Sequence, residues 1–148
     1  TKQNKSFNLT NKDMTRFNIS LDESIEMVLW SLKNSIGGEI VIPKIPSFKI
    51  LDLIKATNNK KNYKIIGIRP GEKIDEELLS KADSANSIDI GKYYIILQNI
   101  NDNKKLSYYK KKFSYKKVKA NFSYNSRDNT NFLSVNQLKE ILHKLKSH

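Results

Sequence analysis

The chain has 148 residues, of which 38% are hydrophobic and 28% charged, and its formal net charge at pH 7 is +12. This composition suits a folded domain with a core, and no apolar run approaches the ~20 residues of a membrane-spanning helix, so we expect a cytoplasmic protein without a membrane partner. The absence of cysteine excludes disulfides and thiolate catalysis, and with His143 and His148 as the only histidines we expect no metal site.

The N-terminal segment predicts a short strand followed by a helix. Residues 7–10 form the strand. Ser20 and Glu23 have the S-x-x-E spacing of a capping box, and apolar residues then recur at helical spacing, which predicts a helix over residues 21–34. Two consecutive glycines, at residues 37–38, end this helix.

Alternation of strand and helix continues in the middle of the chain. Residues 39–42 are typical of a strand that a proline ends, and residues 47–57 of a helix with an apolar face. Residues 63–68 are β-branched and apolar, which predicts a second strand. This strand would place Arg69 at its carboxyl end, where open α/β sheets bind their ligands.

Three further elements are predicted in the C-terminal half. We expect a helix over residues 74–80, because the carboxylates of residues 75–77 in its first turn would favour the helix dipole. Residues 93–97 predict a strand. Ser134 and Gln137 form a second capping box, and the apolar stripe that follows predicts a C-terminal helix that packs against a core.

Residues 101–119 concentrate the positive charge, with eight lysines against one aspartate. Aromatic residues lie between these lysines: Tyr108, Tyr109, Phe113 and Tyr115. Alternating rings and cations are typical of a binder of single-stranded nucleic acid, which would centre on residues 104–119. We favour the plainer interpretation, a solvated lysine-rich loop or hairpin, so that nucleic acid is a disfavoured partner.

The sequence Arg69-Pro70-Gly71-Glu72 has two interpretations. Proline fixes φ and glycine permits a left-handed turn, so the four residues suit an ordinary turn at the end of a strand. An arginine beside a carboxylate can also bind a diphosphate through its planar guanidinium while the carboxylate binds the diol of a ribose. The second interpretation predicts one end of a nucleotide-sugar site.

Four motifs in order resemble those of one family. They are Met14-Thr15-Arg16-Phe17, residues 37–40 running into residues 43–47, residues 66–73, and residues 122–126 followed by residues 133–135. The family is the inverting UDP-N-acetylglucosamine 4,6-dehydratases of the CapD-like polysaccharide-biosynthesis group, which are extended short-chain dehydrogenases. The resemblance extends over about residues 7 to 145, nearly the whole chain.

This resemblance implies an α/β fold, a small mixed sheet with helices from the C-terminal portion of an extended short-chain dehydrogenase. Family members begin with a Rossmann domain that binds NADP through G-x-G-x-x-G, and no glycines here have that spacing. We therefore expect residues 1–148 to be a single substrate-binding lobe whose Rossmann core is absent or incomplete. Its expected partners are a UDP-sugar and a Rossmann half or a full-length homo-oligomer, with no cofactor bound by this chain alone.

The family's catalytic Tyr-x-x-x-Lys pair would also lie in the Rossmann half. Tyr108 with Lys112 and Tyr115 with Lys119 have this spacing, but they follow the substrate motifs and lie in a lysine-dense tract, so we take both as accidental. We expect no catalytic residue here. In the family, NADP oxidises the sugar at C4, water is lost across C5 and C6, and hydride returns to C6 with inversion at C5. These steps need the Rossmann half, so the isolated chain is predicted to be inactive.

The resemblance also implies roles for five residues in holding UDP. Arg16 and Arg69 would contact the diphosphate, Glu72 would bind the ribose hydroxyls, and Met14 and Thr15 would supply backbone or packing contacts.

Two features of the family pattern stay open. The family commonly has histidine where Asp75 stands, and residues 124–126 match a motif without an evident physical role. Two alternatives to a dehydratase are a related UDP-sugar epimerase and the nucleic-acid-binding module described above.

Overall fold

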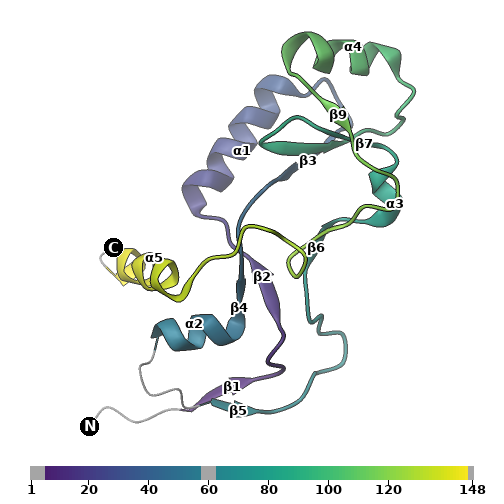
Figure 1. The fold of residues 1–148 in the computed structure, drawn as a ribbon. Helices are drawn as coiled ribbons and strands as arrows, with labels where there is room; N and C mark the ends of the chain where they lie inside the picture. The colour runs from purple at the N-terminus through teal and green to yellow at the C-terminus, as the bar shows by residue number, and fades with distance from the viewer. Residues whose placement is uncertain (1–5, 58–62, 147–148) are drawn as a thin grey trace. The chain divides into compact units, whose positions relative to one another are not determined.

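A computed structural model describes residues 6–57 and 63–146 (Figure 1). The chain divides into two compact units: unit 1 comprises Thr1–Asn18, Pro46–Glu76 and Ser126–His148, and unit 2 comprises Ile19–Ile45 and Glu77–Asn125. Both contain helices and short strands, so the predicted α/β class with small sheets is confirmed. The single substrate-binding lobe over residues 1–148 stays a prediction about function.

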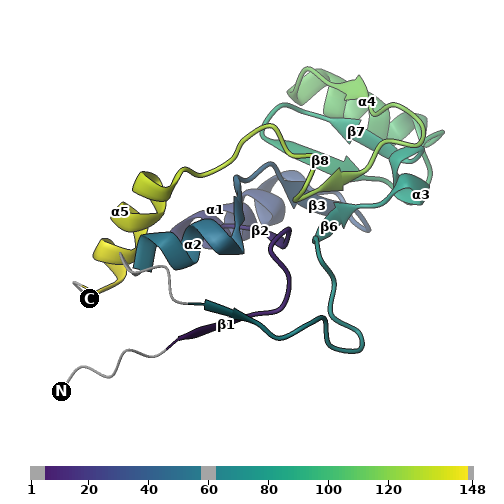
Figure 2. The same ribbon diagram turned by 60° about the horizontal axis from the view of Figure 1, so that its bottom comes forward.

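The described residues of unit 1 form two small sheets and two helices. Its elements are β1 (Phe7–Leu9), β2 (Thr15–Phe17), β4 (Ser47–Lys49), α2 (Ile50–Thr57), β5 (Tyr63–Ile65) and α5 (Val135–Lys146). β1 pairs with β5 in parallel, and β2 pairs with β4 antiparallel. Helices α2 and α5 lie side by side in both views (Figures 1 and 2), and each buries an apolar residue, Ile54 and Leu138.

Unit 2 contains the larger sheet. Its elements are α1 (Leu21–Asn34), β3 (Ile40–Pro43), β6 (Glu77–Leu79), α3 (Lys81–Ser84), β7 (Ser87–Asp89), β8 (Tyr93–Ile96), α4 (Asn103–Lys112), β9 (Lys116–Lys117) and β10 (Tyr124–Asn125). Strands β3, β8, β7 and β9 form an antiparallel sheet in that order, and β6 pairs with β10. The core comprises Ile88, Tyr93, Ile95, Leu97 and Tyr109.

The predicted capping box of α1 is confirmed. The Ser20 hydroxyl accepts a hydrogen bond from the Glu23 backbone N–H, and the Glu23 carboxylate accepts one from the Ser20 N–H at 2.8 Å. The bond from the Ser20 N–H, and then a second bond that the Ser20 hydroxyl donates to the same carboxylate at 2.7 Å, lower the pKa of Glu23. The second box is also present, because the Gln137 side chain accepts from the Ser134 N–H at 2.9 Å.

The turn after α1 depends on both glycines and on Glu39. Gly37 and Gly38 have φ values of 119° and 78°, which disfavour any residue with a Cβ. The Glu39 side chain is fully buried and accepts hydrogen bonds from the N–H groups of Gly37 (2.7 Å) and Ile36 (3.3 Å). Its Oε1 lies 3.6 Å from Nζ of Lys105, which joins this turn to α4.

Two helix predictions in the middle of the chain are wrong in part or in full. Residues 74–80 form no helix; the segment bends at residues 74–75 and continues into β6, because its carboxylates and backbone bond to other segments of the chain. Residues 47–49 belong to β4, since their backbone pairs with β2, and α2 begins only at Ile50.

The lysine-rich segment is also corrected. Residues 103–112 form helix α4 instead of a loop or hairpin, and β9 then pairs with β7. Asp102 caps the helix by accepting from the Lys105 N–H at 3.0 Å. Leu106, Tyr109 and Phe113 recur at helical spacing and pack into or against the core. This apolar face stabilises a helix whose other residues are largely lysine.

Candidate functional site in unit 1

Residues Arg69 to Glu72 form a tight turn. The Glu72 N–H donates to the Arg69 carbonyl at 3.0 Å, and Gly71 has a φ of 80°. Proline followed by a glycine of positive φ fits the central positions of a type II turn. The turn thus fixes how the backbone leaves Arg69.

The carboxylate of Glu72 is held in place by two donors. Its Oε2 accepts from the Arg69 N–H at 3.2 Å, and its Oε1 accepts from the Thr10 hydroxyl at 3.0 Å. A carboxylate has about four acceptor positions, so each oxygen can still accept from a ligand hydroxyl. The side chain is therefore oriented but not saturated.

The Arg69 side chain is exposed, and no hydrogen bond or ion pair joins its guanidinium to another described residue. Arg69 therefore combines a guanidinium whose five N–H donors are available with a backbone N–H that contacts an oriented carboxylate. A guanidinium in this state can bind an anion without first breaking an internal contact. The arrangement suits a ligand that has both an anionic group and neighbouring hydroxyls.

Arg16, by contrast, already donates to the protein. Its Nη1 donates to the carbonyls of Thr15 (2.6 Å) and Ile74 (2.9 Å), and its Nη2 donates to that of Lys73 (2.9 Å). Its Nε lies 3.6 Å from Oε1 of Glu76. These contacts fix the guanidinium against residues 73–76. One N–H of Nη2 remains for a ligand.

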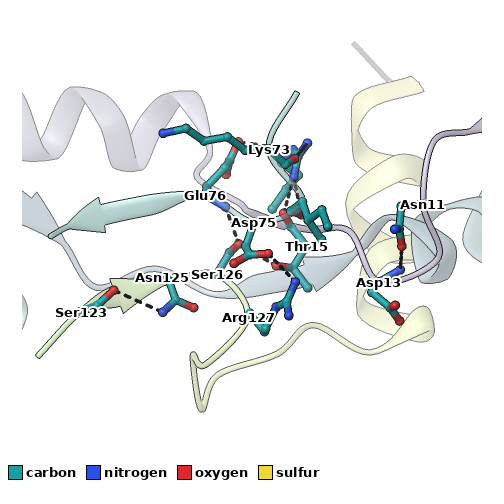
Figure 3. Close-up of polar contacts among 12 residues, drawn as sticks. Asn11, Asp13, Thr15, Lys73, Asp75, Glu76, Ser123, Asn125, Ser126 and Arg127 are labelled. Atoms are coloured by element: carbon teal, nitrogen blue, oxygen red, sulfur yellow. Dashed lines mark hydrogen bonds and ion pairs between the residues drawn. The ribbon is translucent and has the colours of Figure 1, made fainter. Parts of the chain in front are cut away.

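Met14 and Thr15 lie in the interior of unit 1, each 3% exposed. The Thr15 hydroxyl is 2.7 Å from the Ser126 hydroxyl (Figure 3). Thr15 N–H donates to the Ile74 carbonyl at 3.0 Å. Both residues therefore supply packing and backbone contacts, close to residues 73–76.

Ser126 joins these segments and was not predicted as a functional residue. Its hydroxyl accepts from the Glu76 N–H at 2.9 Å, and its own N–H donates to the Glu76 carbonyl at 2.8 Å (Figure 3). Glu76 in turn accepts from the Phe17 N–H at 2.8 Å. The motif at residues 124–126 marked the position of Ser126 in the sequence, but its partners are distant in the chain.

An ion pair holds the same stretch from another side. Nη2 of Arg127 lies 2.6 Å from Oδ1 of Asp75, the position at which the family commonly has histidine (Figure 3). This contact gives Asp75 a partner in the bend before β6, where the sequence suggested the first turn of a helix.

Tyr124, from the same motif, has a structural role in unit 2. Its hydroxyl donates to the Ile45 carbonyl at 2.8 Å and accepts from the Ile45 N–H at 3.0 Å. Burial raises the pKa of Tyr124, which keeps the hydroxyl protonated and able to make both bonds. Tyr124 thus anchors β10 to the end of the β3 segment.

The predicted substrate residues therefore form two groups within unit 1. Arg69 and Glu72 form the turn, and Thr15 and Arg16 contact the stretch that follows it, with Met14 next to them in the chain. Among the described residues, no hydrogen bond joins Arg16 to Arg69 or Glu72. Residues 73–76 connect the two groups along the chain.

Comparisons with known proteins identify the family of the chain. The family model described as polysaccharide biosynthesis protein matches residues 1–98. The chain is 39% identical over 141 residues to a UDP-N-acetylglucosamine 4,6-dehydratase (inverting) of Campylobacter jejuni subsp. jejuni serotype O:2, and 35% identical over 145 residues to a UDP-glucose 4-epimerase of Rickettsia bellii. The matches cover 93% and 95% of this chain but 42% of each relative.

Among solved structures, Pen from Bacillus thuringiensis has a similar fold. It superposes with a TM-score of 0.74 at 25% identity, over 98% of this chain and 42% of that one. The chain thus spans less than half the length of these proteins. With a family model that matches about two thirds of its residues, the chain belongs to the polysaccharide biosynthesis protein family.

Proposed function

We propose that the chain is the nucleotide-sugar-binding part of a UDP-N-acetylglucosamine 4,6-dehydratase acting in glycan biosynthesis in the cytoplasm. The observation that carries this proposal is the turn at residues 69–72, which holds the Glu72 carboxylate in place and bears the exposed Arg69 guanidinium, a group with no partner among the described residues. The 39% identity to the Campylobacter jejuni dehydratase supports the choice of reaction.

In this proposal Arg69 binds the diphosphate and Glu72 the ribose. A planar guanidinium offers two parallel N–H donors to a phosphate, a geometry that an ammonium group cannot match. The free acceptor positions of the Glu72 carboxylate suit the two hydroxyls of a ribose. Arg16 adds one N–H to the diphosphate, and Met14 and Thr15 keep its backbone in place.

The chain's own residues do not fit NADP. A dinucleotide pyrophosphate requires a glycine-rich turn that opens a helix. Gly37, Gly38, Gly71 and Gly91 lie in bends or turns and Gly67 lies in an irregular segment after β5, and none of the five opens a helix. We therefore assign no step of the reaction to these residues, and propose that this chain alone is inactive.

The binding proposal is tested by titrating UDP and UDP-N-acetylglucosamine into the chain by calorimetry, with wild type compared to Glu72→Gln. We expect both ligands to bind the wild type, and Glu72→Gln to weaken both, because a neutral amide accepts more weakly from hydroxyls. Thymidine diphosphate, which lacks the ribose 2′-hydroxyl, serves as the control ligand. If Glu72→Gln binds UDP as tightly as wild type, the ribose role is wrong.

A UDP-sugar epimerase is the second candidate. The Rickettsia bellii epimerase matches the same share of the chain, and by its name it too acts on a UDP-sugar. A dehydratase and an epimerase would both bind the UDP group, so the turn at residues 69–72 does not distinguish between these two enzymes. Product analysis of a complete enzyme does, because a dehydratase releases a 4-keto sugar and water while an epimerase releases an isomer.

A further inference from the structure

Thr10 is the first residue after β1, and the pairing of β1 with β5 brings it to the proposed ribose site. The two strands are parallel, with Leu9 opposite Ile65, and the Ile66 N–H donates to the Leu9 carbonyl at 2.9 Å. Because the strands are parallel, their carboxyl ends lie at the same edge of the pair. Thr10 therefore leaves β1 beside the segment that leads into the turn at residues 69–72.

The backbone on both sides fixes the position of Thr10. Before it, Leu9 is buried in unit 1. After it, the Asn11 side chain accepts a hydrogen bond from the Asp13 N–H at 2.8 Å (Figure 3), and the next residue, Met14, is buried again. Because Thr10 lies in a short segment between two buried residues, the fold sets the direction of its half-buried side chain.

Thr10 and the turn hold the Glu72 carboxylate through different oxygens. The Thr10 hydroxyl donates to Oε1 at 3.0 Å, and the Arg69 N–H donates to Oε2 at 3.2 Å. The last torsion of a glutamate side chain is otherwise broad, so a donor on each oxygen is needed to stop the carboxylate from rotating. Of these two donors, Thr10 is the one from outside the turn, 62 residues away in the chain.

A carboxylate held in this way presents two neighbouring acceptors. Each oxygen uses one acceptor position for the protein and keeps another for a ligand. The 2′- and 3′-hydroxyls of a ribose are neighbours and can donate to both oxygens at once, whereas a 2′-deoxyribose has only the 3′-hydroxyl. Discrimination between the two sugars therefore depends on how firmly the plane of the carboxylate is held.

We propose that Thr10 is a positioning residue that makes the site selective for ribonucleoside diphosphates over their 2′-deoxy counterparts. This rests on the proposed function, in which Glu72 binds the ribose. Thr10 acts through the carboxylate and does not itself bind the ligand. Without the Thr10 hydroxyl, Glu72 keeps only the bond from its own turn and the carboxylate rotates, so a ligand with two hydroxyls loses more affinity than a ligand with one.

Calorimetry with UDP and 2′-deoxyuridine diphosphate tests the proposal, because these two ligands differ by one hydroxyl. Thr10→Val removes the donor and keeps the shape of the side chain, whereas Thr10→Ser keeps the donor. The control is Thr57→Val, which removes a hydroxyl that donates within α2 to the Ile54 carbonyl at 2.9 Å. Urea unfolding shows whether each variant is folded, and Thr10→Ala takes the place of Thr10→Val if the latter is unfolded.

We expect the wild type to bind UDP about tenfold more tightly than the deoxy ligand, the effect of one hydrogen bond to a charged group. Thr10→Val should reduce this ratio at least about threefold, mainly by weakening UDP binding, while Thr10→Ser and Thr57→Val keep it.

Three results would each overturn the proposal while UDP binding, and with it the proposed function, stands. The first is a ratio that Thr10→Val leaves unchanged, even if both ligands bind more weakly, because an equal loss reflects only the stability of the fold. The second is a wild type that binds both ligands equally, and the third is a loss of the ratio in Thr10→Ser. Absence of UDP binding by the wild type would instead contradict the proposed function itself.

Discussion

Arg69 is the residue on which the proposed ligand depends most. Replacing it by alanine removes the one guanidinium of the turn that has no partner among the described residues. We expect the dissociation constant for UDP-N-acetylglucosamine to rise roughly ten- to thousand-fold, the range for loss of a charge-assisted contact. Calorimetry measures this dissociation constant on the complete enzyme, or on a chimera in which this chain replaces the matched stretch of the Campylobacter jejuni dehydratase.

The conservative variant makes this test specific. Arg69→Lys keeps the charge but cannot offer two parallel donors, so we expect it to recover little of the affinity. Lys64→Ala removes an exposed cation from β5, the strand that precedes the turn, and should bind as wild type. Wild-type affinity in Arg69→Lys would mean that the guanidinium has no bidentate role.

Ser126 should matter for stability. Its buried hydroxyl contacts Thr15 and the Glu76 N–H, and alanine would leave both groups without this partner. We expect Ser126→Ala to lower the free energy of unfolding by about 1–3 kcal/mol, the cost of unsatisfied buried polar groups. Urea denaturation gives the value, with the exposed Ser114→Ala as the control. A loss no larger than that of Ser114→Ala would show that the network contributes little.

Tyr109 makes stability depend on high pH. Burial, with the nearby Glu39 carboxylate as a smaller cause, raises the pKa of its buried hydroxyl to about 12. The unfolded chain loses this proton near pH 10. Above that pH the unfolded state binds fewer protons than the folded state, so stability falls as pH rises from about 10 to about 12.

Tyr109→Phe isolates this contribution. The hydroxyl makes no hydrogen bond of ordinary geometry with a described residue, so its removal should change stability at pH 7 by less than about 1 kcal/mol. Denaturation at several alkaline pH values should then show a shallower loss of stability than in wild type. Tyr94 and Tyr124, whose pKa values burial also raises, keep part of the dependence. An unchanged slope would contradict the role of Tyr109.

At the scale of elements, local sequence signals predicted a helix start and a turn whose stabilising contacts are local. The capping box of α1 joins residues three apart, and the turn at residues 69–72 closes on itself, so both could be predicted. The helix predicted over residues 74–80 was wrong because the partners of its carboxylates are distant in the sequence. Glu76 bonds to residues 50 and 59 positions away, and Asp75 pairs with an arginine 52 positions away.

The same reasoning explains the candidate site. Arg69 and Glu72 were found because an arginine and a carboxylate in one turn are visible as a motif. The role of Ser126 requires knowing that residue 126 lies against β2, and the contacts of Arg16 require knowing where residues 73–76 run. Charge counting also hid α4, since its helical face consists of the apolar and aromatic residues between the lysines.

The packing of helix α4 favours a solvated charged surface over a nucleic-acid-binding site. Tyr109 is buried, Phe113 packs against Trp30, and Tyr115 packs against the core, so these rings are not available for stacking on bases. The lysines remain as a cationic face. We therefore expect weak, sequence-independent binding of single strands that is lost at about 150 mM salt.

Replacing Lys110, Lys111 and Lys112 by glutamine tests this expectation. The triple variant should reduce what binding exists at low salt, with a salt dependence that falls by about 0.7 per lost phosphate contact. Fluorescence anisotropy with labelled single-stranded DNA and RNA measures it, and Arg69→Ala is the control. Submicromolar binding at physiological salt that the triple variant loses and Arg69→Ala keeps would favour the nucleic-acid module over the nucleotide-sugar site.

At the scale of the whole molecule, we expect this chain to bind the UDP-sugar but not to catalyse the reaction. We propose that the oriented Glu72 carboxylate and the Arg69 guanidinium, which has no partner among the described residues, bind UDP, whereas none of the glycines opens a helix for a dinucleotide. We expect the chain, incubated with NADP and UDP-N-acetylglucosamine, to bind the UDP-sugar and to form no 4-keto sugar.

Mass spectrometry of the reaction mixture detects the loss of water from the sugar. The positive control is a chimera in which this chain replaces the matched stretch of the Campylobacter jejuni dehydratase. Product from the chimera but not from the chain would show that the UDP grip of this chain serves a reaction whose hydride chemistry lies in the other part. Product from the pure chain would overturn this division, and would direct attention to Tyr108 with Lys112 and Tyr115 with Lys119. The first of these pairs is already in contact, because Nζ of Lys112 donates to the Tyr108 hydroxyl at 3.0 Å. If this pair were catalytic, Tyr108→Phe would abolish formation of the 4-keto sugar. We expect the variant to leave product formation by the chimera unchanged.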